Sequence, residues 1–229
     1  MSHIIFYDIP STARIPYETE WVESADIEAK CKEMGAPPTT KNPDGTPLYT
    51  LPAIYDPSTG AVVSESTEIA VYLDAAYPNT PKLIIPGSRE LQREALDFHF
   101  EAGSMQLRQF TIPAAYRVIN PRSQAFFRTK EAFIGMTIEE FCPSGKRREE
   151  EWAKLKKEFS IIASRLPRKQ GLYIMGSEIC YLDFMVASHL ISMKKLFGEN
   201  SSEWNDIKTW DSGRWGKILK SVEKYEIIV

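Results

Sequence analysis

Hydrophobic and polar positions between residues 49 and 76 predict two short strands followed by a helix. Leu51–Asp56 is a β-prone run that includes a proline near its start, and Ala61–Ser64 is a second β-prone run. Because the residues between them, Pro57-Ser58-Thr59-Gly60, favour a turn, the two runs predict an antiparallel hairpin. Apolar residues then recur at helical spacing, which predicts a helix capped by Ser64 or Glu65 and extending to about Ala75.

The chain before this region carries weaker β patterns and one short helical pattern. Ile4–Tyr7 is a short apolar run and is predicted to be a strand. Tyr17–Glu23 alternates between its two faces, which predicts a second strand. Asp26–Met34 has apolar residues at helical spacing and precedes Gly35, so we expect a helix that ends there. Ala36–Pro47 is rich in proline and is expected to be a loop.

The later part of the chain has helical patterns throughout. We expect an α/β domain over residues 1–78, a proline-rich linker over 79–89 and an all-helical domain over 90–229. Pro113 is expected to end or kink the first helix of that domain. The helical runs are Glu90–Phe110, Ser123–Phe141, Lys146–Leu166, Leu182–Phe197, Asn205–Trp210 and Gly213–Tyr225.

Composition narrows the classes of function. The 229 residues are 43% hydrophobic and 26% charged, as in an ordinary globular protein, and the net charge is −3. Because a nucleic-acid-binding surface is usually strongly basic, we expect no nucleic-acid partner. No apolar run approaches the roughly 20 residues of a membrane span, and the first residues lack the pattern of a signal peptide. We therefore expect a cytoplasmic protein without a membrane partner.

The cysteines and histidines do not have the spacing of metal ligands. The three cysteines are far apart in the sequence and form no CxxC motif, so we expect free thiols and no metal site. These residues are Cys31, Cys142, Cys180, His3, His99 and His189.

Two short motifs between residues 49 and 76 suit the recognition of an amino acid. Ser64-Glu65-Ser66-Thr67 stands at a predicted helix start, where free N–H groups and the helix dipole favour a carboxylate. Ser66 adds a hydroxyl donor, and Glu65 can accept a hydrogen bond from an ammonium group. If the Leu51–Pro52 bond is cis, the main chain of Leu51 can pair with that of a ligand. The alternatives are an ordinary trans proline at a strand start and a simple helix cap.

The order of these motifs resembles the glutathione-binding half of a glutathione transferase. LPAIYD, a turn, VVSES and IAVYLD follow one another as in that family. Longer strings, such as IPYETEWVE, DGTPLYTLP and DPSTGAVVSES, are most similar to the fungal FuA class, which is related to the bacterial lignin β-etherases. The resemblance covers nearly the whole chain. It implies a thioredoxin-like N-terminal domain, an all-helical C-terminal domain and a homodimer.

The resemblance also implies ligands and site residues. Leu51, which precedes the cis-proline Pro52 of the family, would pair with the cysteinyl backbone of glutathione. Glu65 and Ser66 would hold its γ-glutamyl head. The implied function is the addition of the glutathione thiol to hydrophobic aromatic electrophiles, in detoxification or aromatic metabolism. Glutathione is then the co-substrate, and no metal is implied.

The sequence departs from the family between its first two predicted strands. A thioredoxin-like domain joins these parallel strands through a helix, and such a crossover takes about a dozen residues or more. Here the connector is Asp8–Pro16, which contains prolines and no helical period, and it is either genuine or a gene-model artefact. Because the catalytic Ser of the FuA class lies in the omitted segment, the catalytic residue is unknown. Ser11 and Thr12 match the end of the preceding strand rather than the catalytic position.

Two alternatives to an active transferase stay open. The chain can be a catalytically impaired binder of aromatic ligands, similar to the ligandins, with its pocket between the domains. It can also be a chain that does not fold stably, because one face of its sheet lacks a covering helix. The aromatic residues that would line such a pocket, or else form core, are Phe98, Phe100, Phe110, Tyr116, Phe126 and Phe127.

One further motif concerns folding rather than chemistry. The family has a Ser/Thr-x-x-Asp capping box at the start of the helix predicted over Leu182–Phe197. Asp183 matches its last position, whereas Cys180 replaces the hydroxyl residue and is expected to cap poorly.

Overall fold

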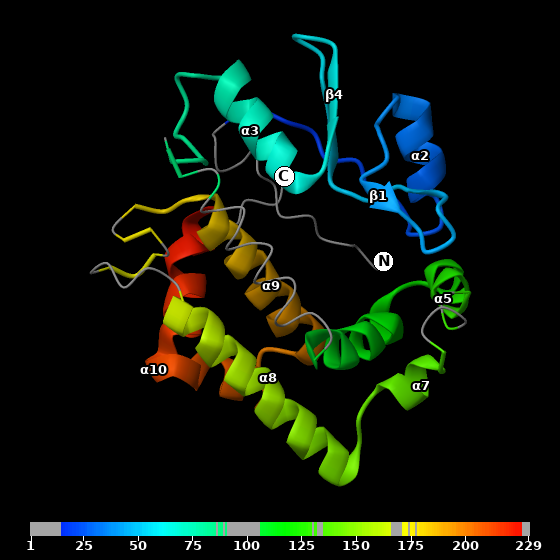
Figure 1. Cartoon of the computed structure of the whole chain (residues 1–229), viewed down its shortest axis with the longest axis vertical. Helices are drawn as coiled ribbons and strands as arrows, with labels where there is room; N and C mark the ends of the chain where they lie inside the picture. The colour runs from blue at the N-terminus through cyan, green and yellow to red at the C-terminus, as the bar shows by residue number, and fades with distance from the viewer. Residues whose placement is uncertain are drawn as a thin grey trace. The chain divides into compact units, whose positions relative to one another are not determined.

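A computed structural model describes residues 15–85, 87, 88, 90, 106–129, 131, 135–165, 171–173, 175, 176 and 178–225. Among them, 15–84 and 120–126 form a first compact unit, and the others form a second unit. Figure 1 labels the helices and strands of both units. The segment 120–126 therefore groups with the first unit, although its sequence lies between helices of the second. The domain limits drawn from the sequence stay a prediction.

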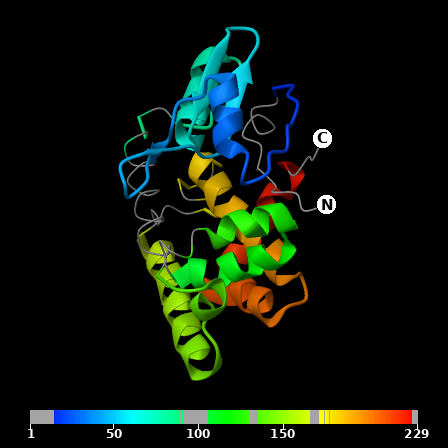
Figure 2. The same cartoon turned by 90° about the vertical axis from the view of Figure 1, so that its right-hand side faces the viewer.

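The first unit is built around the predicted hairpin. Strand β3 (Ala53–Asp56) pairs in antiparallel fashion with β4 (Ala61–Ser64). Helix α3 (Ser66–Ala76) packs against both strands and buries Ile69, Ala70 and Leu73. In Figure 1 the hairpin stands between α3 and helix α2 (Ile27–Met34), and Figure 2 shows α2 in front of the hairpin. The predicted strand–turn–strand–helix order is confirmed.

A buried carboxylate fastens the turn of this hairpin to α3. Asp56 is 6% exposed, and its Oδ2 accepts hydrogen bonds from the hydroxyls of Tyr72 at 2.6 Å and Tyr77 at 2.7 Å. Its Oδ1 accepts from the N–H and the hydroxyl of Ser58. The hydrogen bonds from Ser58, Tyr72 and Tyr77 hold the pKa of Asp56 far below its usual value. The turn residue and the helix are thus held by one charged group.

The expected loop over Ala36–Pro47 contains a small hairpin instead. Strand β1 (Thr40–Lys41) pairs with β2 (Pro47–Leu48) in antiparallel fashion. The side chain of Asp44 closes the connection by accepting from the N–H of Thr46 at 3.0 Å. Side chains of Asn and Asp often form turns by such bonds to the backbone. Asp44 therefore indicated a turn, but we predicted a loop because the segment is rich in proline.

The strand predicted over Tyr17–Glu23 is wrong, because the structure assigns no strand to these residues. A strand requires ladder hydrogen bonds to a neighbouring strand, and alternation in the sequence cannot supply them. The neighbour expected for it, Ile4–Tyr7, lies outside the described residues. The next element, α2, follows the prediction and ends at Gly35, whose φ of 76° is left-handed.

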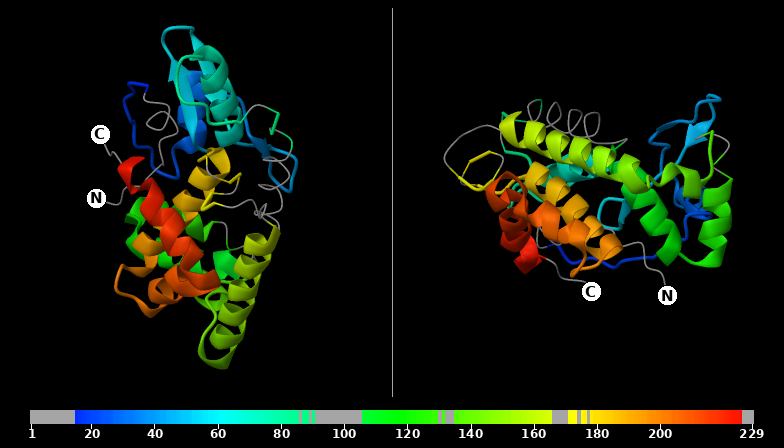
Figure 3. Two further views of the ribbon diagram at one scale, coloured as in Figure 1. Left: turned by 90° about the vertical axis from the view of Figure 1, so that its left-hand side faces the viewer. Right: turned by 90° about the horizontal axis from the view of Figure 1, so that it is seen from below.

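The second unit is helical, as expected. After a helical stretch over 106–118, its elements are α5 (Pro121–Arg128, which begins in the first unit), α7 (Ile138–Phe141), α8 (Gly145–Arg165), α9 (Tyr181–Phe197), α10 (Ser202–Val222) and the short 3₁₀ helix η1 (Glu223–Tyr225). Helix α10 packs against α8 and α9 (Figure 3). Its backbone leaves the helical conformation at Trp210–Gly213, where the sequence predicted a break between two helices. Pro113 does not end its helix, which continues to residue 118.

Aromatic side chains form the core of the second unit. The ring of Phe159 contacts Trp210 and Trp215 at centroid distances of 5.4 and 5.0 Å, in edge-to-face geometry. At the start of α9, the carboxylate of Asp183 accepts from the N–H of Cys180 at 2.9 Å, so this half of the capping box is confirmed. No helix among the described residues is both long and apolar enough to cross a membrane.

Candidate functional site

The register of the central hairpin brings the two predicted binding motifs together. Ala53 is paired with Ser64, so the residues just before β3 and just after β4 lie at the same end of the hairpin. These are Leu51 and Pro52 on one side and Glu65 and Ser66 on the other. The Leu51–Pro52 bond is cis, which is the geometry that the main-chain pairing hypothesis requires.

Glu65 is the N-cap residue of α3, and its side chain folds back onto the helix start. Its carboxylate accepts hydrogen bonds from the N–H of Thr67 at 3.1 Å and of Glu68 at 3.1 Å. These are the orphan donors at the positive end of the helix dipole, which we expected to receive the carboxylate of a ligand. In the structure, Glu65 itself supplies the negative charge there.

The backbone of Glu65 is unusual for a residue with a side chain. Its φ of 75° and ψ of 127° lie in a region that residues other than glycine rarely adopt. This conformation turns the chain sharply from β4 into α3. Sequence reasoning named Ser64 as an alternative cap, but Ser64 is the last residue of β4 and is 7% exposed.

Ser66 is the first residue of α3 and is partly buried. Its hydroxyl donates to Oε1 of Glu65 at 3.3 Å, so the two side chains already contact one another. The pair therefore presents a carboxylate and a hydroxyl side by side, which suits the ammonium and carboxylate groups of an amino acid.

Two threonines that the sequence did not point to lie next to Leu51. The hydroxyls of Thr39 and Thr50 are 2.9 Å apart, and the Thr39 hydroxyl also lies 3.2 Å from the carbonyl oxygen of Leu48. They tie the segment that follows α2 to the residue before Leu51. The two residues flank the β1–β2 hairpin, so the expectation of a loop over Ala36–Pro47 did not indicate that they meet.

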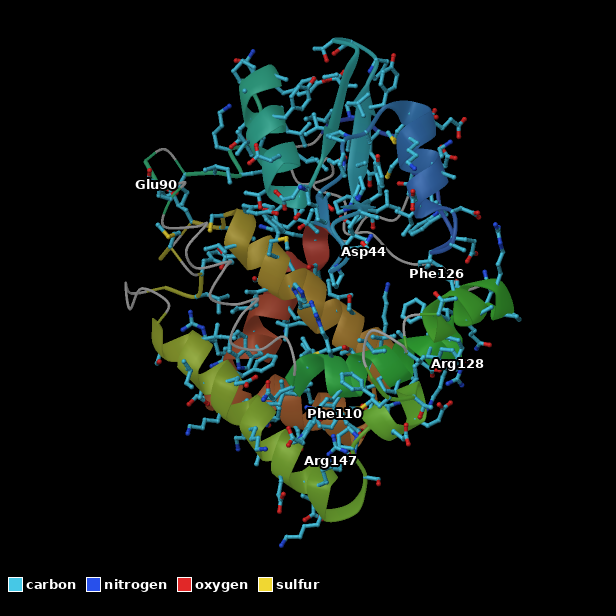
Figure 4. The ribbon with its side chains drawn as sticks, turned by 45° about the vertical axis from the view of Figure 1, so that its right-hand side comes forward. Asp44, Glu90, Phe110, Phe126, Arg128 and Arg147 are labelled. Atoms are coloured by element: carbon cyan, nitrogen blue, oxygen red, sulfur yellow. The ribbon has the colours of Figure 1, made fainter. Side chains whose placement is uncertain are left out.

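The candidate pocket aromatics do not all have the same environment. Phe110 is 3% exposed and packs edge-to-face on Trp152, with ring centroids 4.9 Å apart, so it belongs to the core of the second unit. Figure 4 shows Phe110 and, on the first turn of α8, Arg147. Tyr116 stacks under the guanidinium of Arg128 at 4.6 Å and accepts a hydrogen bond from it at 3.0 Å. Phe98, Phe100 and the hydroxyls of Ser11 and Thr12 lie outside the described residues.

The residues that the structure describes include no group of three or more His, Cys, Asp or Glu side chains arranged to hold a metal ion. Cys180 is fully buried, and burial raises the pKa of its thiol to about 12, so it stays protonated and packs as a small apolar side chain.

Family models match both parts of the chain. Residues 12–76 match the N-terminal domain of glutathione S-transferase, and residues 91–225 match its C-terminal domain. No curated protein sequence matches significantly.

Solved structures of fungal proteins are similar over nearly the whole chain. The glutathione S-transferase CsGST63524 of Ceriporiopsis subvermispora, crystallised with glutathione, is 40% identical, with a TM-score of 0.90, over 96% of this chain and 88% of that one. CsGST83044 of the same fungus, also with glutathione, is 38% identical, with a TM-score of 0.88, over 94% and 88%. GSTFuA3 of Phanerochaete chrysosporium is 35% identical, with a TM-score of 0.88, over 96% and 88%.

Proposed function

Since the chain belongs to the glutathione S-transferase family, we propose that its first unit binds glutathione and presents the thiol to small, electrophilic aromatic molecules. Detoxification or aromatic metabolism is the process that this chemistry serves. Glutathione is the co-substrate, and Leu51, Pro52, Glu65 and Ser66 are the residues that hold it.

The observation that carries this proposal is the pairing of Ala53 with Ser64. It sets the main chain of Leu51 next to the start of α3, so an extended peptide can pair with Leu51 and place an amino-acid head at Glu65 and Ser66. The carboxylate of the γ-glutamyl head would take over the N–H groups of Thr67 and Glu68. Glu65 would then turn to accept from the ammonium group of the same head.

Two effects would speed the reaction once glutathione is bound. Holding the thiol and the electrophile together removes the entropy cost of their encounter. A hydrogen bond to the sulfur would favour the thiolate, which is the nucleophile. The residue that supplies this hydrogen bond is unknown, because the family's catalytic Ser has no counterpart in the short connector Asp8–Pro16.

We predict that glutathione affinity depends on both polar side chains at the start of α3. Losing a hydrogen bond to a charged group costs about 1.5–3 kcal/mol, so Glu65→Ala and Ser66→Ala should each weaken binding by roughly ten- to a hundred-fold. Titration calorimetry measures this, with Glu18→Ala as a control in an exposed residue of the same unit. Unchanged affinity in both site variants would remove these residues from the proposed site.

The short connector also favours a second function, that of a binder of aromatic ligands with little or no turnover. Such a protein would keep its affinity for apolar aromatic molecules while lacking the donor that activates the thiol. The homodimer and the cytoplasmic location implied above stay predictions.

A further inference from the structure

Side chains of the segment 120–126 form hydrogen bonds with the residues that precede α2. Arg122 donates to both carboxylate oxygens of Asp26, one of them at 2.6 Å. The hydroxyl of Ser123, which is 1% exposed, donates to Oε2 of Glu23 at 2.5 Å. Hydrogen bonds from Ser123 and Asn120, and the charge of Arg122, lower the pKa of Glu23, which favours its ionised form. We call these five residues the α2 clamp.

The clamp uses a side chain that would ordinarily stabilise the helix itself. Asp26 is the N-cap residue of α2, and Asp is among the preferred residues at that position. Its side chain nevertheless makes no capping hydrogen bond: its backbone is in the αR conformation rather than the extended one of a capping residue, and its carboxylate bonds to Arg122. The local geometry thus favours attachment of α2 to the segment 120–126 over capping of α2.

Among the residues that the structure describes, few other contacts fix the position of helix α2. It is 8 residues long, which is too short to be stable alone, and Cys31 is the one buried side chain on it. Its other contacts include an ion pair between Lys30 and Glu20 at 2.7 Å, and this pair, like the exposed pair of Arg122 and Asp26, contributes only modestly by itself. The hydrogen bond from the buried hydroxyl of Ser123 to the partly buried Glu23 is therefore a main contact at its N-terminal end.

The far end of α2 leads directly to the candidate site. After Gly35, the N–H of Ala36 bonds to the carbonyl of Cys31, and Ala36 is 4% exposed. Three residues later, the hydroxyl of Thr39 contacts that of Thr50, whose neighbour is Leu51. A shift of α2 is thus transmitted over a short, continuous path to the main chain that we expect to pair with glutathione.

We propose that Arg122 and Ser123, although they lie between helices of the second unit in the sequence, are positioning residues for the Leu51 side of the glutathione site. They act through α2 and Thr39, and they do not touch the ligand. This inference rests on the proposed function for its ligand, but the mechanical link from the clamp to Leu51 is independent of it.

Charge-reversal variants test the clamp, because a double variant can restore the ion pair that each single variant breaks. Arg122→Asp and Asp26→Arg each place like charges together, whereas the double variant restores an ion pair. We expect faster amide hydrogen exchange over residues 36–51 in each single variant of the ligand-free protein, and recovery in the double variant. Exchange over α3 should not change. Arg117→Asp, on an exposed residue of the preceding helix, is the matched control.

Glutathione titration of the same variants gives the functional readout. Each single variant should bind about two- to thirty-fold more weakly, the range for residues that act through packed elements, and the double variant should regain most of the affinity. Ser123→Ala should behave as the single variants do. A fall in melting temperature with unchanged exchange over 36–51 would reduce the clamp to a general stabilising contact and overturn the inference. If exchange responds but the wild-type chain does not bind glutathione, the proposed function fails and the clamp stands.

Discussion

At the scale of single residues, Glu65 combines a capping carboxylate with a backbone conformation that suits glycine. The cap contributes about 0.5–2 kcal/mol to stability, whereas a positive φ in a residue with a side chain costs about 1–3 kcal/mol. Glu65→Ala loses the cap and keeps the strain, so it should be destabilised. Glu65→Gly also loses the cap but relieves the strain. We therefore expect the glycine variant to be more stable than the alanine variant by about 1–3 kcal/mol.

Urea denaturation of the ligand-free variants measures this difference, and both should bind glutathione weakly. Equal stabilities would mean that the turn at Glu65 is not strained in solution.

The sequence could place Glu65 and Ser66 at a helix start because hydroxyl and acidic residues there are a strong signal. It could not show that Glu65 occupies the donors itself, since that depends on the φ of 75° at which the chain enters α3.

At the scale of elements, the hairpin and α3 are held as one body by Asp56. Asp56→Ala removes the charged acceptor that Ser58, Tyr72 and Tyr77 share, and should cost about 2–3 kcal/mol in unfolding free energy. Tyr72→Phe removes one donor and should cost about 1 kcal/mol. Equilibrium denaturation at neutral pH compares them. A loss no larger in Asp56→Ala than in Tyr72→Phe would show that the network does not act as a unit.

The same carboxylate gives the wild-type chain a pH dependence with a definite sign. The folded-state pKa of Asp56 is depressed, so its contribution is complete above the unfolded-state pKa of about 3.9 and falls as pH drops below that value. The stability gap between the wild type and Asp56→Ala should therefore be constant from neutral pH down to about pH 5 and narrow below pH 4. A gap that stays constant to pH 3 would contradict this assignment.

The sequence correctly predicted those helices and strands that are determined by residues close to one another in the chain. The turn formers at Pro57–Gly60 and the helical period after Ser64 fix the hairpin and α3, and Gly35 ends α2. The strand expected over Tyr17–Glu23 was wrong because a strand depends on a partner that alternation does not reveal. Asn120-Pro121 was a readable helix start that we missed: the Asn120 side chain accepts from the N–H of Ser123, and proline suits the first turn.

At the scale of the whole molecule, the resemblance read from the sequence agrees with the family matches. Both glutathione S-transferase domains are matched, over residues 12–76 and 91–225. The sequence nevertheless raises the question of whether this chain can activate the thiol of glutathione once it has bound it. The connector Asp8–Pro16 is shorter than the dozen or more residues of an ordinary crossover, and the resemblance implies that the activating Ser of the family belongs to the omitted segment.

We therefore predict weak or absent catalysis by this chain, even where glutathione binds. Without a donor to its sulfur, bound glutathione keeps a thiol pKa near the free value of about 8.5, so a few per cent is thiolate at neutral pH. The rate with a chromophoric electrophile should then barely exceed that of glutathione alone. A large enhancement that Ser11→Ala abolishes would instead make Ser11 the catalytic residue. Displacement of an environment-sensitive dye by lignin-derived phenols, measured beside this assay, separates the remaining cases. Retained displacement without turnover identifies a binder, whereas no dye binding together with a non-cooperative melt would show that the omitted helix was needed for the fold itself.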